Sequence, residues 1–189
     1  NEFMAAPAGG VVAPQAAEQL RKALGFEFCT SFYERLDSDS CVNARIGNLH
    51  FWMGGQWCYV SSQCRRLGQG AVVPNTTVAW KTCGAAQDSQ LRDRTVPEII
   101  AMAAAGKLDV ALLVKLAYHT IPLGFQQTNE EQIARQQREP APLVFDSASG
   151  HPSFQVVSSG TIWRVTRGTA PDGNDPSTWN TVPCVAGCL

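Results

Sequence analysis

Seven cysteines in a chain of 189 residues constrain this sequence more than any other feature. Five of them fall within one stretch of the N-terminal half, and the other two lie close to the C-terminus. Cysteines at this density usually form disulfides, which persist only in oxidising compartments. The candidates for disulfide formation are Cys29, Cys41, Cys58, Cys64, Cys83, Cys184 and Cys188.

The spacing of these cysteines argues against a metal site. Zinc is usually held by two closely spaced ligand pairs, whereas Cys58-x5-Cys64 and Cys184-x3-Cys188 supply no matching C-x2-C pairs. We therefore expect disulfides, no metal and no cofactor. Because seven is odd, one cysteine is left over or bridges to another chain, and the spacing alone does not assign the pairs. Cys184 and Cys188 either bridge back to the cysteine-rich part or bridge one another.

The charge of the chain limits its partners. Fifteen basic residues stand against 16 acidic ones, so the net charge is −1, which argues against a nucleic-acid partner. Only 16% of the residues are charged, below the roughly 25% of typical soluble domains. Part of the surface is therefore expected to be covered by a partner.

Neither a membrane span nor a leader is expected in the sequence. The most apolar stretch, residues 99–125, is interrupted by charged residues and a proline, so no transmembrane span is expected. The first residues lack a basic segment followed by an apolar run, so a targeting segment would have been removed earlier.

The pattern of residues divides the chain into four parts. Residues 1–13 are rich in Ala, Gly, Pro and Val and read as an extended arm. Residues 14–120 hold a short amphipathic helix that ends at Leu24, the cysteine-rich module and a helical hairpin. Residues 121–142 form a polar linker, and residues 143–189 form a β-hairpin with a tail pinned by disulfides. The fold class is α+β: a small disulfide-stapled β-rich module, a short helical hairpin and a C-terminal β-hairpin.

Strand and helix signals place the elements in the middle of the chain. Residues 57–60 and 78–83 predict strands. Thr95 and Glu98 form a capping-box pattern that begins a helix through about Ala104, with Gly106 just after its end. Asp109 can cap a second helix over residues 110–118.

The second helix of this hairpin is apolar almost all round, with Lys115 as the exception. Such a helix is buried on most sides. It either belongs to the domain's own core or presents a docking face to another protein or to a membrane surface. The residues of that docking face would be Val110, Leu113, Val114, Ala117 and Tyr118.

The C-terminal part mixes polar and strand-like segments. Residues 129–137 form either a solvent-facing helix or part of the linker. Residues 143–145, 154–157 and 161–165 predict strands, and Ser158-Ser159-Gly160 suits a hairpin loop. Residues 168–180 read as a loop.

No sequence motif of an enzyme is present. His50, His119 and His151 lie far apart, and His119 ends an apolar helix, where a histidine usually interacts with the helix dipole. The Asp and Ser residues at 37–40 lack the spacing of a calcium loop. A thiol oxidoreductase using Cys184 and Cys188 is disfavoured because redox motifs use C-x2-C. We therefore predict that the chain is not an enzyme and name no catalytic residue.

Exposed tryptophans would support a second hypothesis for the function, in which the chain is a secreted disulfide-rich module that binds carbohydrate or protein. Trp52, Trp57 or Trp163 would then form a stacking platform. The alternative is that the tryptophans belong to the core. Glycosylation of the sequon at Asn75 would favour the secreted module.

The cysteine-rich part resembles a known family. The residues that carry the likeness are Gly55-Gln56-Trp57-Cys58-Tyr59-Val60-Ser61, Cys64, Val78-Ala79-Trp80-Lys81-Thr82-Cys83, Leu91-Arg92-Asp93, Pro97-Glu98 and the run Leu108 to Tyr118. Over residues 29–118 the chain resembles cysteine-rich plastid proteins of dinoflagellate-type algae. This resemblance implies the oxidising thylakoid lumen and a role as a non-catalytic accessory subunit that docks on a membrane protein complex, a photosystem. It transfers no catalytic residue.

Overall fold

The computed structural model describes residues 35–36, 40–43, 55–149, 152–172 and 174–188. The chain divides into two compact units, Asn1–Gln90 and Leu91–Leu189. The fold is α+β, as predicted. The expected arm over residues 1–13 and the expected helix before Gly25 lie outside the described residues. The sequence grouped the helical hairpin with the cysteine-rich module, whereas the structure places it in the second unit.

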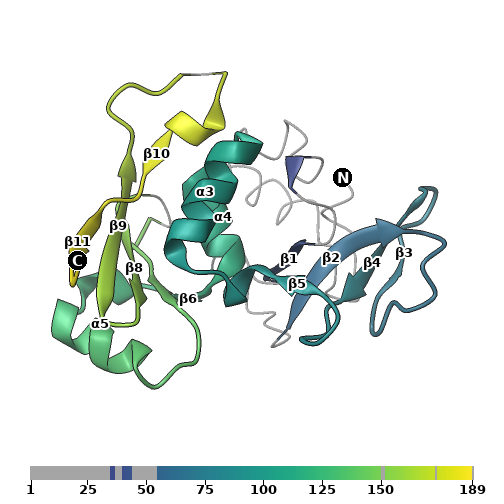
Figure 1. Cartoon of the computed structure of the whole chain (residues 1–189), viewed down its shortest axis with the longest axis horizontal. Coiled ribbons are helices and arrows are strands. Elements are labelled where there is room, and N and C mark those ends of the chain that lie inside the picture. The colour runs from purple at the N-terminus through teal and green to yellow at the C-terminus, as the bar shows by residue number, and fades with distance from the viewer. Residues whose placement is uncertain (1–34, 37–39, 44–54, 150–151, 173, 189) are drawn as a thin grey trace. The chain divides into compact units, whose positions relative to one another are not determined.

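The first unit is built on a five-stranded sheet with the order β3-β4-β2-β1-β5 (Figure 1). All neighbouring strands are antiparallel except β1 and β5, which are parallel. The strands predicted at residues 57–60 and 78–83 are confirmed as β2 and β4. The strands are β1 (Ser40–Asn43), β2 (Gln56–Ser61), β3 (Ala71–Val72), β4 (Val78–Thr82) and β5 (Ser89–Gln90).

The two faces of this sheet carry different side chains. Successive residues of a strand point to opposite faces, and residues paired across strands share a face. Tyr59 pairs with Trp80, and Trp57 meets Tyr59 edge-on, with ring centroids 5.0 Å apart. Cys58 pairs with Lys81 and so faces the other side. Trp57 and Trp80 are buried, which confirms the interpretation of these two rings as core.

Two short helices form the hairpin of the second unit: α3 (Val96–Gly106) and α4 (Val110–Ala117). The capping box of Thr95 and Glu98 is formed as predicted, and Asp109 caps α4. Gly106 was expected just after the end of α3, but the helix includes it and Lys107 takes the left-handed conformation instead. This ending lets the buried Leu108 donate its N–H to the Ala103 carbonyl, as in a common helix C-terminal motif.

The remainder of the second unit is a six-stranded sheet with the order β10-β9-β8-β7-β6, and β11 also pairs with β9. The predicted hairpin is confirmed as β8 and β9, and its loop places Ser159 and Gly160 at positive φ. The expected loop at 168–180 holds a short 3-10 turn (Pro176–Thr178) and the start of β10. The strands are β6 (His119–Ile121), β7 (Leu143–Phe145), β8 (Phe154–Ser158), β9 (Thr161–Arg167), β10 (Asn180–Thr181) and β11 (Cys184–Ala186).

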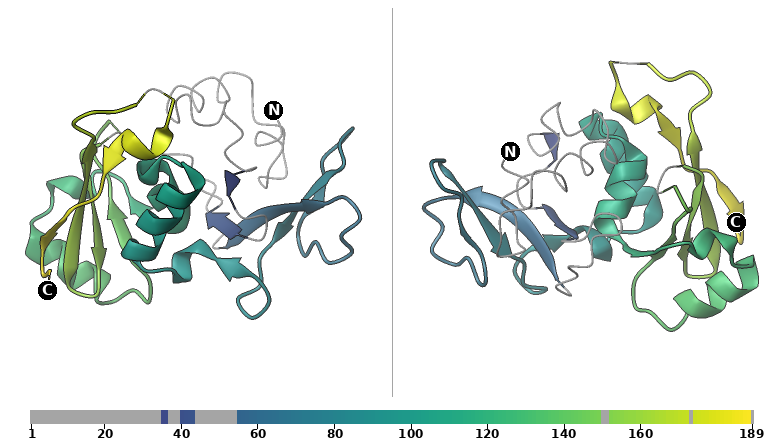
Figure 2. Two further views of the ribbon diagram at one scale, coloured as in Figure 1. Left: turned by 45° about the horizontal axis from the view of Figure 1, so that its top comes forward. Right: turned by 180° about the vertical axis from the view of Figure 1, so that it is seen from behind.

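Helices cover both faces of this sheet (Figures 1 and 2). The polar segment 121–142 contains α5 (Asn129–Gln136), the helical one of the two alternatives that the sequence left open. This helix connects the parallel strands β6 and β7, and Ile133 packs against the cluster around Phe145. On the other face, Lys115 of α4 lies over the Phe154 ring. Because both faces are covered, every residue of β7 is buried.

The proposed docking residues on α4 are enclosed within the chain itself. All five side chains are at most 5% exposed, and Tyr118 is completely buried. The residues are Val110, Leu113, Val114, Ala117 and Tyr118. In this structure they form core, the alternative to a docking face, and present no surface to a partner. Among the described residues, no helix has the length and apolar character needed to cross a membrane.

Candidate functional site

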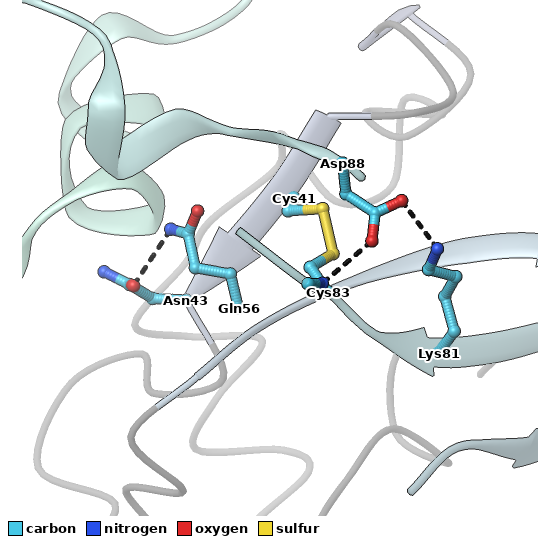
Figure 3. The surroundings of a disulfide bond; sticks show 7 residues. Cys41, Asn43, Gln56, Lys81, Cys83 and Asp88 are labelled. Carbon is cyan, nitrogen blue, oxygen red and sulfur yellow. Dashed lines mark hydrogen bonds and ion pairs between the residues drawn. A yellow bond between two sulfur atoms is a disulfide. The ribbon is translucent and has the colours of Figure 1, made fainter. Parts of the chain in front are cut away.

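Among the described residues, two disulfides are formed, and they involve four cysteines. Cys41 is bonded to Cys83, 42 residues along the chain, with their Cα atoms 6.4 Å apart (Figure 3). Cys184 and Cys188 form a local bridge, the second of the two arrangements left open above. These bridges fit an oxidising, non-cytosolic compartment.

The remaining cysteines lie outside these two bridges. Cys58 is buried and Cys64 is half-buried, and neither belongs to a disulfide. Cys29 lies outside the described residues. The structure therefore leaves two thiols, rather than one, in the described part of the cysteine-rich module.

A third cysteine lies beside the Cys41–Cys83 bridge because of the strand register. Val42 pairs with Trp57 across β1 and β2, and the next residues on these two strands are Cys41 and Cys58. On its other side Cys58 pairs with Lys81, and Cys83 follows two residues later. The sulfur atoms of Cys41, Cys58 and Cys83 all lie within 4.8 Å of one another. The site is thus a disulfide with a thiol sulfur within 4.8 Å of it, and we call these three residues the cysteine trio.

An ion pair borders the cysteine trio (Figure 3). Lys81 Nζ lies 2.6 Å from Asp88 Oδ1, and Asp88 Oδ2 accepts the Gly84 N–H at 2.9 Å. The hydrogen bond to Asp88 raises the pKa of Lys81, which negative charge at Cys58 and Cys64 raises further. Burial opposes ionisation of Asp88, but its hydrogen bonds outweigh burial and lower its pKa. A permanent ammonium therefore lies beside the Cys58 thiol.

The chemistry open to the cysteine trio depends on its redox state. With Cys41 and Cys83 bonded to each other, Cys58 alone can act as a thiolate, so three thiolate ligands for a soft metal require a reduced bridge. In the bridged state the arrangement suits thiol–disulfide exchange, in which a thiolate attacks a disulfide sulfur.

Sequence reasoning missed the two charged residues of this site, Lys81 and Asp88. A signal was present, since Lys81 and Cys83 are two residues apart in the strand predicted at 78–83, and such residues point to the same side of a sheet. Recognising Cys58 as their neighbour also required the register between β2 and β4, which no local pattern supplies. Next to the site, Gln56 Nε2 donates to Asn43 Oδ1 at 3.1 Å and holds β1 against β2.

The other residues singled out by the sequence lie elsewhere. His119 was expected to end the second helix of the hairpin. This expectation is wrong, because α4 ends at Ala117 and His119 is the exposed first residue of strand β6. His50, His151 and Trp52 lie outside the described residues. Trp57 is buried and offers no stacking surface, whereas Trp163 on β9 is half-buried.

Comparisons of the chain with protein-family models, with curated proteins and with solved structures find no match.

Proposed function

We propose that this chain is a non-catalytic accessory protein of an oxidising compartment, which docks on a larger membrane protein complex through strand β3. The compartment is supported by the two disulfides. The docking is supported by one observation, the exposed and uncharged edge of the sheet in the first unit.

The edge of this sheet is apolar. Strand β3 ends the sheet order on its side, and both of its residues are exposed. Val72 is 49% exposed, one of the large apolar side chains on the surface of the described residues. The stretch from Leu67 to Trp80, which forms β3 and its flanking turns, contains no charged residue. Its composition accounts in part for the low charge of the whole chain.

Such an edge is suited to bind an extended segment of another protein. Natural proteins usually protect an edge strand with charges, prolines or bulges, because its outer N–H and C=O groups can pair with another strand. Here Pro74 closes the strand on one side, but no charge lies on it. The occupant we propose is an extended, alternately apolar segment of the partner, added as the next strand beside Val72.

The more specific form of the proposal follows from the resemblance alone. The likeness over residues 29–118 includes β2 and β4, the strands next to this edge, and implies the thylakoid lumen and a photosystem as the complex. The proposal does not require the helix α4 to dock, since its side chains are buried.

The test is binding of the purified chain to isolated photosystem complexes, followed by comigration on native gels. The change Val72→Lys places a charge on the edge and is expected to weaken binding about tenfold or more, or about 1.4 kcal/mol. Val185→Lys is the matched control, since it makes the same change at another exposed strand position, in β11. Normal binding by Val72→Lys with loss in Val185→Lys would overturn the choice of β3. A folded wild-type chain that binds no photosystem would refute the photosystem as partner.

Trp163 favours a second candidate function, a secreted binding module for carbohydrate or protein. Its ring is half-buried and its Nε1–H donates to Thr161 Oγ1 at 3.0 Å, which fixes the ring on the sheet. If this reading holds, glycan-array binding by the wild type will be lost in Trp163→Ala. Sugar attached to Asn75, which is exposed, would point the same way.

A further inference from the structure

We propose that Cys58 exchanges with the neighbouring disulfide, forming Cys41–Cys58 and turning Cys83 into a thiol that is open to modification by a small external disulfide. This inference goes beyond the docking function and does not depend on it. It rests on the three sulfur atoms of the cysteine trio, which lie within 4.8 Å of one another.

The strand register favours one product of the exchange. Cys41 lies opposite Cys58 on the adjacent strand when the β1–β2 pairing is continued by one position. Side chains at such opposed positions have Cβ atoms about 4.5–5.5 Å apart, and the lower end of this range meets the upper end of the roughly 3.5–4.5 Å that a disulfide needs. Cys58 and Cys83 are related only diagonally across β2 and β4. The bridge between Cys41 and Cys58 is therefore the favoured one.

The exchange moves the thiol toward solvent. Cys58 is 5% exposed and Cys41 is completely buried, whereas Cys83 is half-buried and followed by the exposed residues 84–87. Before exchange the reactive thiol is sheltered in the sheet. After exchange it is located where the chain leaves β4 and small molecules have access.

The exchange is balanced within the protein and needs no oxidant or reductant. The Cys58 thiolate forms a bond to the Cys41 sulfur, the Cys41–Cys83 bond breaks, and its electron pair stays on the Cys83 sulfur. The proton that Cys58 loses to solvent is replaced by one that Cys83 takes up. In the second step Cys83 attacks an external disulfide, keeps one half as a mixed disulfide and releases the other half as a thiol.

Lys81 acts as a positioning residue in this exchange. It pairs with Cys58 across the strands, and a cation beside a thiol favours the thiolate. The hydrogen bond to Asp88 at 2.6 Å fixes the ammonium in place. The neutral Lys81→Met keeps most of the side-chain volume and should slow the exchange without changing which disulfides form.

The test is a short pulse of iodoacetamide on the native protein, followed by acid quench, digestion and mass spectrometry of labelled and bridged peptides. The background is Cys29→Ser with Cys64→Ser, which leaves the cysteine trio and the Cys184–Cys188 bridge as the remaining cysteines. We expect label on Cys83 together with a Cys41–Cys58 bridge, and several-fold slower labelling of Cys83 in Lys81→Met. Oxidised glutathione should add to the same residue.

The decisive comparison is Cys58→Ser in the same background. In that variant the label on Cys83 should disappear while the Cys41–Cys83 bridge remains. Label on Cys58 alone in the background protein, or label on Cys83 that persists in Cys58→Ser, would overturn the proposal. The peptide map of the background protein gives this answer even if Cys58→Ser fails to fold. The Cys184–Cys188 bridge is an internal control, because it should stay intact throughout.

Discussion

Lys115 is the one charged side chain of helix α4, and the structure explains its presence there. Its ammonium lies 3.0 Å from both carboxylate oxygens of Asp146 and 4.5 Å from the centre of the Phe154 ring. Burial lowers the pKa of Lys115, and the charge of Asp146 opposes this shift. The side chain is therefore held as a buried ion pair rather than as a solvent contact of an apolar helix.

Breaking this ion pair from one side should be costly. Lys115→Met leaves the Asp146 carboxylate buried without its counter-charge, and the expected loss is about 3 kcal/mol of unfolding free energy. Adding Asp146→Asn to the same variant should recover part of that loss, because the stranded charge is then removed. Urea unfolding of the two single variants and the double variant measures this coupling. A single variant within about 0.5 kcal/mol of the wild type would contradict the prediction.

Tyr118 should make the protein sensitive to alkali. Its hydroxyl donates to the Arg94 carbonyl at 2.8 Å. Burial, assisted by the charge of Glu98, raises its pKa above the ordinary 10.0. Below pH 10.0 the phenol is protonated in both the folded and the unfolded chain, and it causes no pH dependence. Above that pH only the unfolded chain ionises, so stability should fall by up to about 1.4 kcal/mol per pH unit.

The variant Tyr118→Phe isolates this effect. It loses the hydrogen bond to Arg94 and should be less stable at neutral pH, but its stability should fall less steeply above pH 10.0 than that of the wild type. Urea unfolding at a series of alkaline pH values measures both slopes. Equal slopes in the two proteins would show that Tyr118 does not titrate differently on unfolding.

Lys115 also shows which contacts of a single residue can be predicted from the sequence and which cannot. Periodicity identified Lys115 as the exception on α4, but its partner Asp146 lies 31 residues further along the chain. Helical spacing predicts pairs three or four residues apart. A contact between a helix and the end of a distant strand has no such local signature, so this ion pair was not predictable.

Among the secondary-structure elements, the start of α4 is tied to strand β10 through one side chain. Asp109 Oδ1 accepts the Ala111 N–H at 2.9 Å and the Asn180 Nδ2–H at 2.8 Å. Burial raises the pKa of Asp109, although these hydrogen bonds act in the opposite direction. The cap therefore needs an oxygen acceptor at this position more than it needs a negative charge.

Two substitutions separate the acceptor from the charge. Asp109→Asn keeps an oxygen that can accept both hydrogen bonds, and asparagine caps helices as well as aspartate does, so stability should change little. Asp109→Ala removes the cap and leaves the Asn180 amide without this acceptor, at an expected cost of about 1–3 kcal/mol. Thermal and urea unfolding of the two variants checks the ranking. Equal losses in both would mean that the charge itself matters.

Helix starts were the most predictable elements, because a cap is a local pattern. The capping box of Thr95 and Glu98 fixed the start of α3. The same pattern, Thr128 followed by Glu131, begins α5 and would have decided between helix and linker. Of the six-stranded sheet, the sequence predicted only a hairpin. Pairings such as that of β6 with β7 join distant segments and follow from no local pattern. The candidate site shares this limit, since its cysteines were known but their neighbours depend on register.

At the scale of the whole molecule, the two disulfides differ in what they constrain. Cys41–Cys83 joins β1 to the residue that follows β4, across 42 residues, whereas Cys184–Cys188 spans four residues at the end of the second unit. In the chain-entropy description, the stabilisation grows with the length of the closed loop. Each bridge acts within one unit, because the chain divides after Gln90 and neither bridge crosses that point.

Removing each bridge by paired Cys→Ser changes should therefore affect different parts of the chain. Loss of Cys41–Cys83 should lower the stability of the first unit by about 4 kcal/mol, and loss of Cys184–Cys188 should lower that of the second by about 2 kcal/mol or less. Hydrogen exchange followed by mass spectrometry resolves the units. The first change should speed exchange in β2 and β4 and leave α3, α4 and β8 protected. Equal acceleration in both units would show that they unfold as one cooperative body, because a bridge confined to one unit could then not act on it alone.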